Sequence, residues 1–171
     1  MHAHACRHPI RVLAAILALG TLLGGCTRSN ISDRKIDYIS LTQAVDLYEQ
    51  QQRDGDTALF IDARSPDRYA QAHIPGARNL RTPDIDLRYD PDPALTRFDN
   101  LIIYGENPGT ASVNAMAKQM IEAGYNSFIK RRVKVFLGGW REWEITGLPI
   151  EEPQPAQPAD QPAQDQPDEQ Q

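Results

Sequence analysis

The chain of 171 residues carries 18 lysines and arginines against 23 aspartates and glutamates, a formal net charge of −5. This composition excludes the strongly basic surface on which nucleic-acid binding depends. Its two cysteines, Cys6 and Cys26, lie near the start, so the later residues can form neither a disulfide nor a Cys-x-x-Cys metal or redox site. A single histidine, His73, follows residue 26, so we expect no metal site and no cofactor.

The first 26 residues have the features of an export signal. Two arginines precede an apolar stretch over residues 12–23, which is too short for a membrane span of about 20 residues. Residues 23–26, Leu-Gly-Gly-Cys, resemble the bacterial lipoprotein signal. The resemblance implies cleavage before Cys26 and lipid on its thiol, and Thr27, in place of aspartate, favours the outer membrane. An ordinary cleaved signal peptide with an incidental Cys26 is the alternative.

These features divide the chain into four parts. We expect a signal peptide at 1–25, a lipidated cysteine and polar tether at 26–36, a domain at 37–152 and a tail at 153–171. The tail consists almost entirely of proline, glutamine, alanine and acidic residues. Because it has nothing to bury, we expect it to stay disordered, as a spacer or as a proline-rich binding segment.

Apolar runs alternate with helical patterns in the first half of the domain. Tyr38-Ile39 predicts a short strand, and Ser40–Gln43 fits a capping box at the start of a helix. The unbroken apolar run Ala58–Ile61 is typical of a strand buried on both faces. Ser65-Pro66-Asp67 predicts the start of a second helix, and His73–Gly76 predicts a turn.

The second half repeats this alternation. The polar stretch Pro83–Asp99 predicts either a rim over a ligand crevice or a surface loop. Leu101–Tyr104 predicts a third strand, followed by a Gly/Pro loop and a helix. Alternating apolar residues over 133–137 predict a fourth strand. A short final helix carries Trp140 and Trp143, which we expect to pack in the core.

This order of elements predicts one α/β domain with a mainly parallel sheet and helices on both faces. Ligands in such folds bind at the carboxyl ends of the strands, and the loop after Tyr104 lies at such an end. The basic run Lys130-Arg131-Arg132, with Lys134, is most simply a solvated strand edge or loop. A docking patch for anionic lipid or an acidic partner is the other interpretation.

Two pairs of segments resemble the signatures of a known family, the rhodanese-like (sulfurtransferase) domain. Asp62–Tyr69 with Ala72–Asn79 is similar to the first signature, and Leu137–Trp143 with Gly147–Pro149 to the second. The resemblance covers nearly all of residues 38–150 and implies a single rhodanese-like domain. In active members, a cysteine after the third strand takes up sulfur as a persulfide and passes it to an acceptor. Loop amides, and often an arginine, stabilise the sulfur anion.

The chain departs from the family at that loop. Gly105 stands at the family's cysteine position, so the resemblance implies no catalytic residue, and no sulfur lies within reach in any register. The loop has no arginine, and Glu106 adds negative charge where an anion needs positive charge. If the loop amides still converge, a cysteine replacing Gly105 would fit. Asp62 and Arg64, at the end of the second strand, form an ion pair or line the crevice. The binding candidates are Gly105, Glu106, Asn107, Gly109, Thr110, Asp62 and Arg64.

Catalysis by a hydroxyl group is a weaker interpretation. Thr110 or Ser112 would need an adjacent base, and His73, the sole imidazole of the domain, has a structural turn position in the family. We expect either hydroxyl to cap the following helix instead.

The sequence therefore favours a catalytically inactive binding module anchored in the cell envelope, with another envelope protein as its partner rather than a small ligand. The alternatives are a sulfurtransferase that uses a partner's thiol, an unrecognised hydrolase, and a structural envelope protein acting through its acidic tail.

Overall fold

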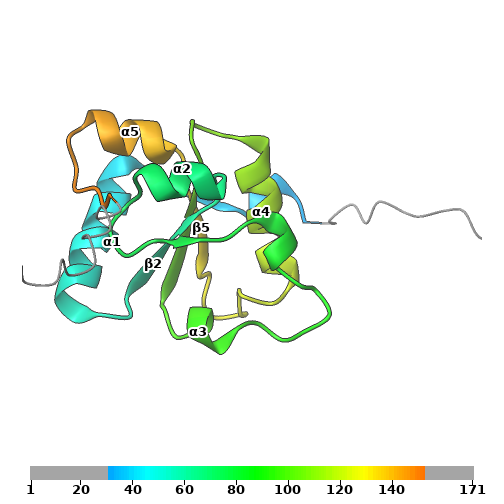
Figure 1. The fold of residues 1–171 in the computed structure, drawn as a ribbon. Coiled ribbons are helices and arrows are strands. Elements are labelled where there is room, and N and C mark those ends of the chain that lie inside the picture. The colour runs from blue at the N-terminus through cyan, green and yellow to red at the C-terminus, as the bar shows by residue number, and fades with distance from the viewer. Residues whose placement is uncertain (1–30, 153–171) are drawn as a thin grey trace, which may run out of the picture.

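The computed structural model describes residues 31–152. Within that range, five strands form one sheet in the order β1-β5-β4-β2-β3, and every neighbouring pair is parallel. Helices cover both faces of this sheet (Figure 1), which confirms the predicted fold class. The elements are η1 (Asp33–Lys35), β1 (Asp37–Ile39), α1 (Leu41–Asp54), β2 (Ala58–Asp62), α2 (Pro66–Gln71), β3 (Arg78–Asn79), η2 (Thr82–Asp84), α3 (Pro93–Thr96), β4 (Asn100–Tyr104), α4 (Ala111–Glu122), β5 (Val133–Phe136) and α5 (Gly139–Ile145).

The predicted signal peptide, the lipidation of Cys26 and the tail lie outside the described residues. The last residues of the predicted tether lie inside them, where η1 forms and Ile36 packs into the core. Across residues 31–152, none of the helices has the length and apolar character needed to cross a membrane.

β2 and β4 lie in the middle of the sheet and are apolar for most of their length. They pair in register from Ala58 with Asn100 to Asp62 with Tyr104. Since helices cover both faces, the strands show no polar alternation. The register brings the last residues of the two strands, Asp62 and Tyr104, side by side.

The core has two halves, one on each face of the sheet. On one face, Met116 and Met120 of α4 pack against apolar residues of β2, β4 and β5. On the other, the Trp143 ring lies 5.3 Å from Tyr48 and 5.6 Å from Phe60, between ring centroids. The Trp143 indole N–H donates to the carbonyl oxygen of Pro149 at 2.8 Å. Both tryptophans are buried, as the sequence predicts.

The segment between η2 and β4 differs from both sequence interpretations. Residues 83–99 neither cover the crevice nor form an open surface loop, because Ile85, Leu95 and Phe98 are buried in the core. α3 lies at the end of the sheet opposite α2 and α5 (Figure 1). Three apolar residues, widely spaced in a polar stretch, give no periodic signal that would have predicted this packing.

Two strands also differ from the prediction. The sequence does not predict β3, because its two polar residues, Arg78 and Asn79, carry no apolar pattern. β5 ends at Phe136, so Leu137 lies beyond the strand and is exposed. The Leu137 amide still donates to the carbonyl oxygen of Ile39 at 3.1 Å. Neither error changes the predicted topology, because β3 lies at the edge of the sheet and the other error concerns only the end of β5.

The basic run before β5 connects neighbouring segments through polar contacts. Arg132 donates to the carbonyl oxygens of Thr96 and Phe98, at 2.6 Å each, and so satisfies the end of α3. Residues 130–132 form a loop, as one of the two sequence interpretations expects, but Lys134 lies in β5, which is paired on both sides and is not a strand edge. The remaining contacts join Lys134 to Asp37 at 2.5 Å, Lys130 to Asp99, and Arg131 to the carbonyl oxygen of Lys35 at 2.8 Å.

Candidate functional site

The loop after β4 is fixed by the start of α5. This loop, residues 105–110, leads from the carboxyl end of β4 to α4. The Trp140 amide donates to the carbonyl oxygen of Gly105 at 2.7 Å, and the Arg141 amide donates to that of Glu106 at 3.1 Å. The backbone amides in the first turn of a helix have no acceptor within that helix. Here two such amides of α5 bind the first half of the loop and hold it in place.

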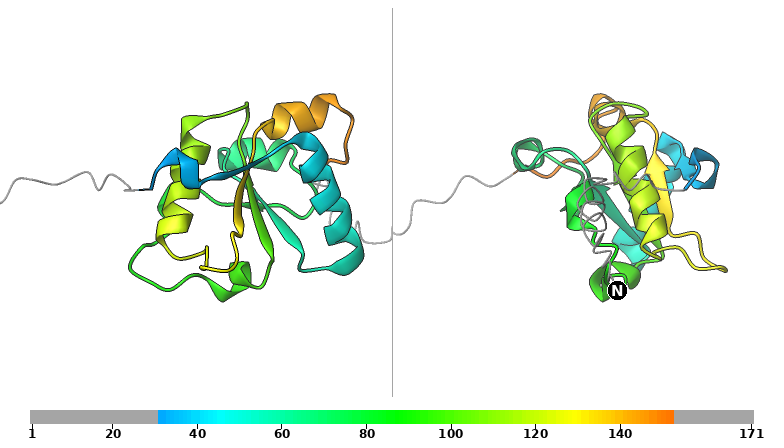
Figure 2. Two further views of the ribbon diagram at one scale, coloured as in Figure 1. Left: turned by 180° about the vertical axis from the view of Figure 1, so that it is seen from behind. Right: turned by 90° about the vertical axis from the view of Figure 1, so that its right-hand side faces the viewer.

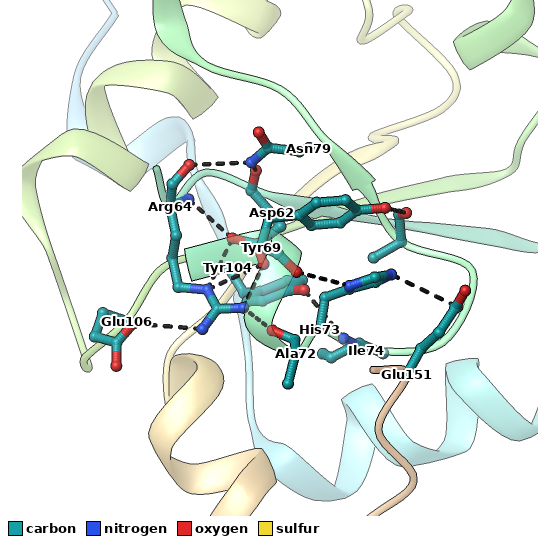
Figure 3. Close-up of polar contacts among 11 residues, drawn as sticks. Asp62, Arg64, Tyr69, Ala72, His73, Ile74, Asn79, Tyr104, Glu106 and Glu151 are labelled. Atoms are coloured by element: carbon teal, nitrogen blue, oxygen red, sulfur yellow. Dashed lines mark hydrogen bonds and ion pairs between the residues drawn. The ribbon is translucent and has the colours of Figure 1, made fainter. Parts of the chain in front are cut away.

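Asp62 and Arg64 form the ion pair that the sequence predicts (Figure 3). Arg64 donates to the Asp62 carboxylate through Nη2 at 2.7 Å and Nε at 3.0 Å, and through its backbone amide at 2.8 Å. Nη2 also donates to the carbonyl oxygen of Ala72 at 2.6 Å, and the guanidinium lies 4.4 Å from the Trp140 ring centroid. Asp62 is fully buried, so it positions Arg64 and presents no surface to a ligand.

Arg64 keeps its charge despite burial. Desolvation by itself lowers the pKa of Arg64, but the hydrogen bonds from Arg64 to Asp62 and the charge of that carboxylate outweigh it and raise the pKa. Tyr104, the neighbour of Asp62 in the sheet, is also buried, and its hydroxyl accepts the Ile74 amide at 3.2 Å. Burial and the Asp62 charge raise the pKa of Tyr104 well above its usual value, so this phenol stays neutral.

Gly105 is buried against α4, and the space beside its Cα is already filled. A Cβ atom added there would lie 2.7 Å from Cγ2 of Val113 and 2.8 Å from Oγ1 of Thr110. Both distances are too short for an undisturbed contact, so the expectation that a cysteine would fit is wrong. Gly105 does not have a positive φ, and therefore space rather than backbone conformation disfavours a larger residue here.

The rest of the loop faces outward. Glu106 is half-buried, with Oε2 3.4 Å from Nη1 of Arg64, while Asn107 and Gly109 are exposed. The backbone amides of Glu106, Asn107, Gly109 and Thr110 donate to no acceptor within residues 31–152. Thr110 occupies the N-cap of α4, but its hydroxyl does not make the predicted capping bond, and Oγ1 is buried with no partner in the described part of the chain.

Two adjoining cavities open beside the loop, and we call them together the crevice. The larger is about 300 Å³, with Gly105 and Thr110 in its lining, and the smaller, toward α5, is about 210 Å³. Three side chains border both: Arg64, Arg68 and Glu106.

The sequence does not single out three charged residues that border the crevice: Arg68 of α2, and Arg141 and Glu144 of α5. The available signal was topological. α2 and α5 each follow the carboxyl end of a strand, so one side of each helix borders the same opening. Among the described residues, these three side chains have no ion-pair partner.

Among the described residues, no imidazole borders the hydroxyl groups of the crevice. Ser112 borders the larger cavity, but His73 lies on the other side of the Asp62–Arg64 pair (Figure 3). The His73 ring stacks on Tyr69 with 3.8 Å between centroids, and its Nε2 lies 3.6 Å from Glu151. His73 therefore has a structural role in joining the segment around Glu151 to α2, and it is not placed to act as the base for a crevice hydroxyl group.

Solved structures with the same fold place the chain in a known architecture. It is similar to the BH2092 protein of Bacillus halodurans at 18% identity, with a TM-score of 0.53 over 70% of this chain and 79% of that one. The RPA3614 protein of Rhodopseudomonas palustris is 20% identical, with a TM-score of 0.56 over 70% of this chain and 87% of that one. A thiosulfate sulfurtransferase from Pseudomonas aeruginosa is 19% identical, with a TM-score of 0.51 over 71% of this chain but 21% of that one.

At these identities the likeness shows the fold alone. A search of curated proteins finds no match. The family model that matches the sequence is that of the rhodanese-like domain, over residues 44–146. This range runs from α1 to the end of α5 and contains the loop, the Asp62–Arg64 pair and the crevice. Because this match covers more than half of the residues of the chain, the chain belongs to the rhodanese-like domain family.

Proposed function

We propose that this chain is a membrane-anchored rhodanese-like domain that transfers no sulfur and acts as a binding module in the cell envelope. The observation that supports this proposal best is the loop after β4. Its first residue, Gly105, lacks a side chain, and Val113 and Thr110 fill the space that a nucleophile's Cβ would need. No cysteine occurs after Cys26, and the Cys26 thiol is proposed to carry lipid.

Electrostatics at the loop also disfavour a sulfur anion. Glu106 contributes a negative charge beside Gly105, and the positive charge of Arg64 is balanced by Asp62 and Glu106. A persulfide anion at this point would lack the excess positive charge that lowers a thiol pKa in reactive sites. A sulfurtransferase that uses a partner's thiol is the second candidate function, favoured by the open crevice and by the two unpaired arginines at its border.

The border of the crevice suits a protein surface carrying both charge signs. Arg68 and Arg141 are cationic and Glu144 is anionic, and in the loop after β4 Asn107 and Gly109 are exposed. The loop amides supply further donors. We infer that the partner is another envelope protein, met at the periplasmic face of the outer membrane to which a lipid on Cys26 would hold the domain.

The chain purified from membranes should convert thiosulfate and cyanide to thiocyanate only at the uncatalysed rate, because no thiol is available to accept the sulfur. Thiocyanate formation measured with and without an added small thiol tests both candidates. A rate roughly tenfold above background without added thiol would contradict the proposal, and a similar rise only with added thiol would favour the partner-thiol alternative.

A photoreactive residue replacing Asn107 should cross-link one discrete envelope protein in intact cells, since Asn107 is exposed and follows Glu106, which borders both cavities. The same residue replacing the exposed Tyr89 is the matched control and should give no such adduct. Reversing both charges with Arg68→Glu and Arg141→Glu should reduce the adduct roughly tenfold, because interface arginines often contribute more than about 1 kcal/mol. An adduct that is equally strong from Tyr89, or unaffected by the reversals, would show that the crevice is not the binding surface.

A further inference from the structure

The turn before β5 holds two large apolar side chains in full contact with solvent. Phe128 and Ile129 are 106% and 94% exposed. They lie at the tip of a turn that does not border the crevice. The turn has a defined shape: the Ser127 amide donates to the carbonyl oxygen of Lys130, and the Lys130 amide donates to Ser127 Oγ, both at 3.0 Å. An ordered turn that presents adjacent aromatic and aliphatic side chains marks an interaction surface.

Positive charge lies on the turn itself and on η1, which a hydrogen bond from Arg131 to Lys35 joins. Arg34, Lys35 and Arg131 are exposed and have no ion-pair partner among residues 31–152. Three carboxylates of η1, β1 and the segment before β4 are already paired, Asp33 with Lys118 at 2.6 Å, Asp99 with Lys130, and Asp37 with Lys134 at 2.5 Å. We call the two apolar residues and the three free cations together the tip surface: Arg34, Lys35, Phe128, Ile129 and Arg131.

The tip surface adjoins the start of the domain. Nη2 of Arg131 donates to the carbonyl oxygen of Lys35, which joins the turn to η1. In the side view of Figure 2, the turn before β5 and η1 lie on the same side of the domain. Cys26 lies five residues before Ile31, a stretch that reaches at most about 18 Å when fully extended. A lipid on Cys26 would therefore hold the tip surface close to the bilayer.

We propose that the tip surface docks on the anionic surface of the membrane that holds the lipid anchor. Phe128 and Ile129 enter the boundary between headgroups and acyl chains, and Arg34, Lys35 and Arg131 contact anionic headgroups. A lipid on Cys26 would hold the domain at the bilayer, and apolar and basic contacts of this kind would then fix which of its faces lies against the membrane. This inference rests on the proposed lipidation of Cys26, and it favours lipid over a second protein copy because of the short tether and the charge.

The test uses the full-length protein purified from membranes and reconstituted into vesicles of phosphatidylglycerol and brominated phosphatidylcholine. Ile129→Trp places a fluorophore at the tip, and Ile145→Trp, at a residue 78% exposed on α5, is the matched control. Because both positions are exposed, both variants should keep the wild-type unfolding midpoint. Wild-type fluorescence, from the buried Trp140 and Trp143, is subtracted.

Bromine should quench the added tryptophan of Ile129→Trp at least roughly threefold more than that of Ile145→Trp. Replacing Arg34, Lys35 and Arg131 with glutamine, or omitting phosphatidylglycerol, should remove that difference, since each lost charge weakens docking about fivefold. Equal quenching of the two variants would overturn the inference, as would a blue shift of Ile129→Trp without vesicles, which would indicate self-association.

The mass of the purified chain shows separately whether Cys26 carries lipid. A lipidated chain with equal quenching at both positions refutes tip docking and leaves the anchor intact. A chain without lipid refutes the anchor. Co-sedimentation with the same vesicles then decides whether the tip binds by itself, and a chain that stays in solution refutes docking as well.

Discussion

Replacing Asp62 with alanine is expected to destabilise the domain by about 3–5 kcal/mol, because it leaves the Arg64 guanidinium buried without its counter-ion. Asp62 is fully buried and accepts from Arg64 at 2.7 Å, so water cannot easily replace the lost carboxylate. The measurement is the free energy of unfolding in urea. A loss of this size is a large fraction of the stability of a typical domain.

The chain contains its own control for this experiment. Asp86 and Arg88 have the same spacing and the same 2.7 Å contact between Nη2 and carboxylate, but this pair is exposed to solvent. Asp86→Ala should therefore change stability far less than Asp62→Ala. A double replacement, Asp62→Leu with Arg64→Met, should recover part of the loss, since no buried charge of the pair remains, although the Ala72 carbonyl oxygen and Glu106 then lack Arg64 as a partner. Equal effects at Asp62 and Asp86 would show that burial does not determine the strength of the Asp62–Arg64 pair.

Gly105→Cys is expected to cost about 1–3 kcal/mol of stability and to give no sulfurtransferase activity, because the new Cβ would overlap Val113 and Thr110. The measured cost distinguishes two possibilities. A loop that differs from an active one only in lacking the cysteine would accept Gly105→Cys without strain, whereas a loop whose space is already filled would not. Urea unfolding measures the cost, and persulfide formation after incubation with thiosulfate measures the chemistry.

Shortening the two side chains that overlap the new Cβ should reduce the stability cost of Gly105→Cys. Thr110→Ala and Val113→Ala remove the two atoms in closest approach, so Gly105→Cys should cost less in that background than in the wild type. Removing the Thr110 hydroxyl by itself should cost little, since Oγ1 has no hydrogen-bond partner within residues 31–152. Ser112→Cys, on the exposed side of the crevice, controls for adding a thiol. A Gly105→Cys protein as stable as Ser112→Cys would show that the loop adapts freely.

The fold could be predicted largely because its central strands are so apolar. Ala58–Ile61 and Leu101–Tyr104 are short unbroken apolar runs, which are typical of strands covered on both faces. β3 escaped prediction because its pairing with β2 depends on the backbone and not on apolar side chains. Residues 83–99 were misjudged for a related reason, since isolated apolar residues show their burial only once the tertiary structure is known.

The candidate site was predictable where neighbours in sequence are also partners in space. The spacing of Asp62 and Arg64 allows an ion pair across one residue, and the structure forms it. The filling of the space beside Gly105 could not be read in this way, because Val113 lies on the next helix and its direction depends on how α4 packs. Arg68, Arg141 and Glu144 were missed because they meet only when α2 and α5 converge on the loop.

The parallel sheet gives the molecule two chemically different poles. Every strand runs in one direction, so the turn before β5 belongs to the pole where strands begin, and the loop after β4 belongs to the pole where they finish. A protein attached to a bilayer through the first pole would turn the second toward the aqueous compartment. The common direction of the strands would thus be enough to orient the loop after β4 away from the membrane.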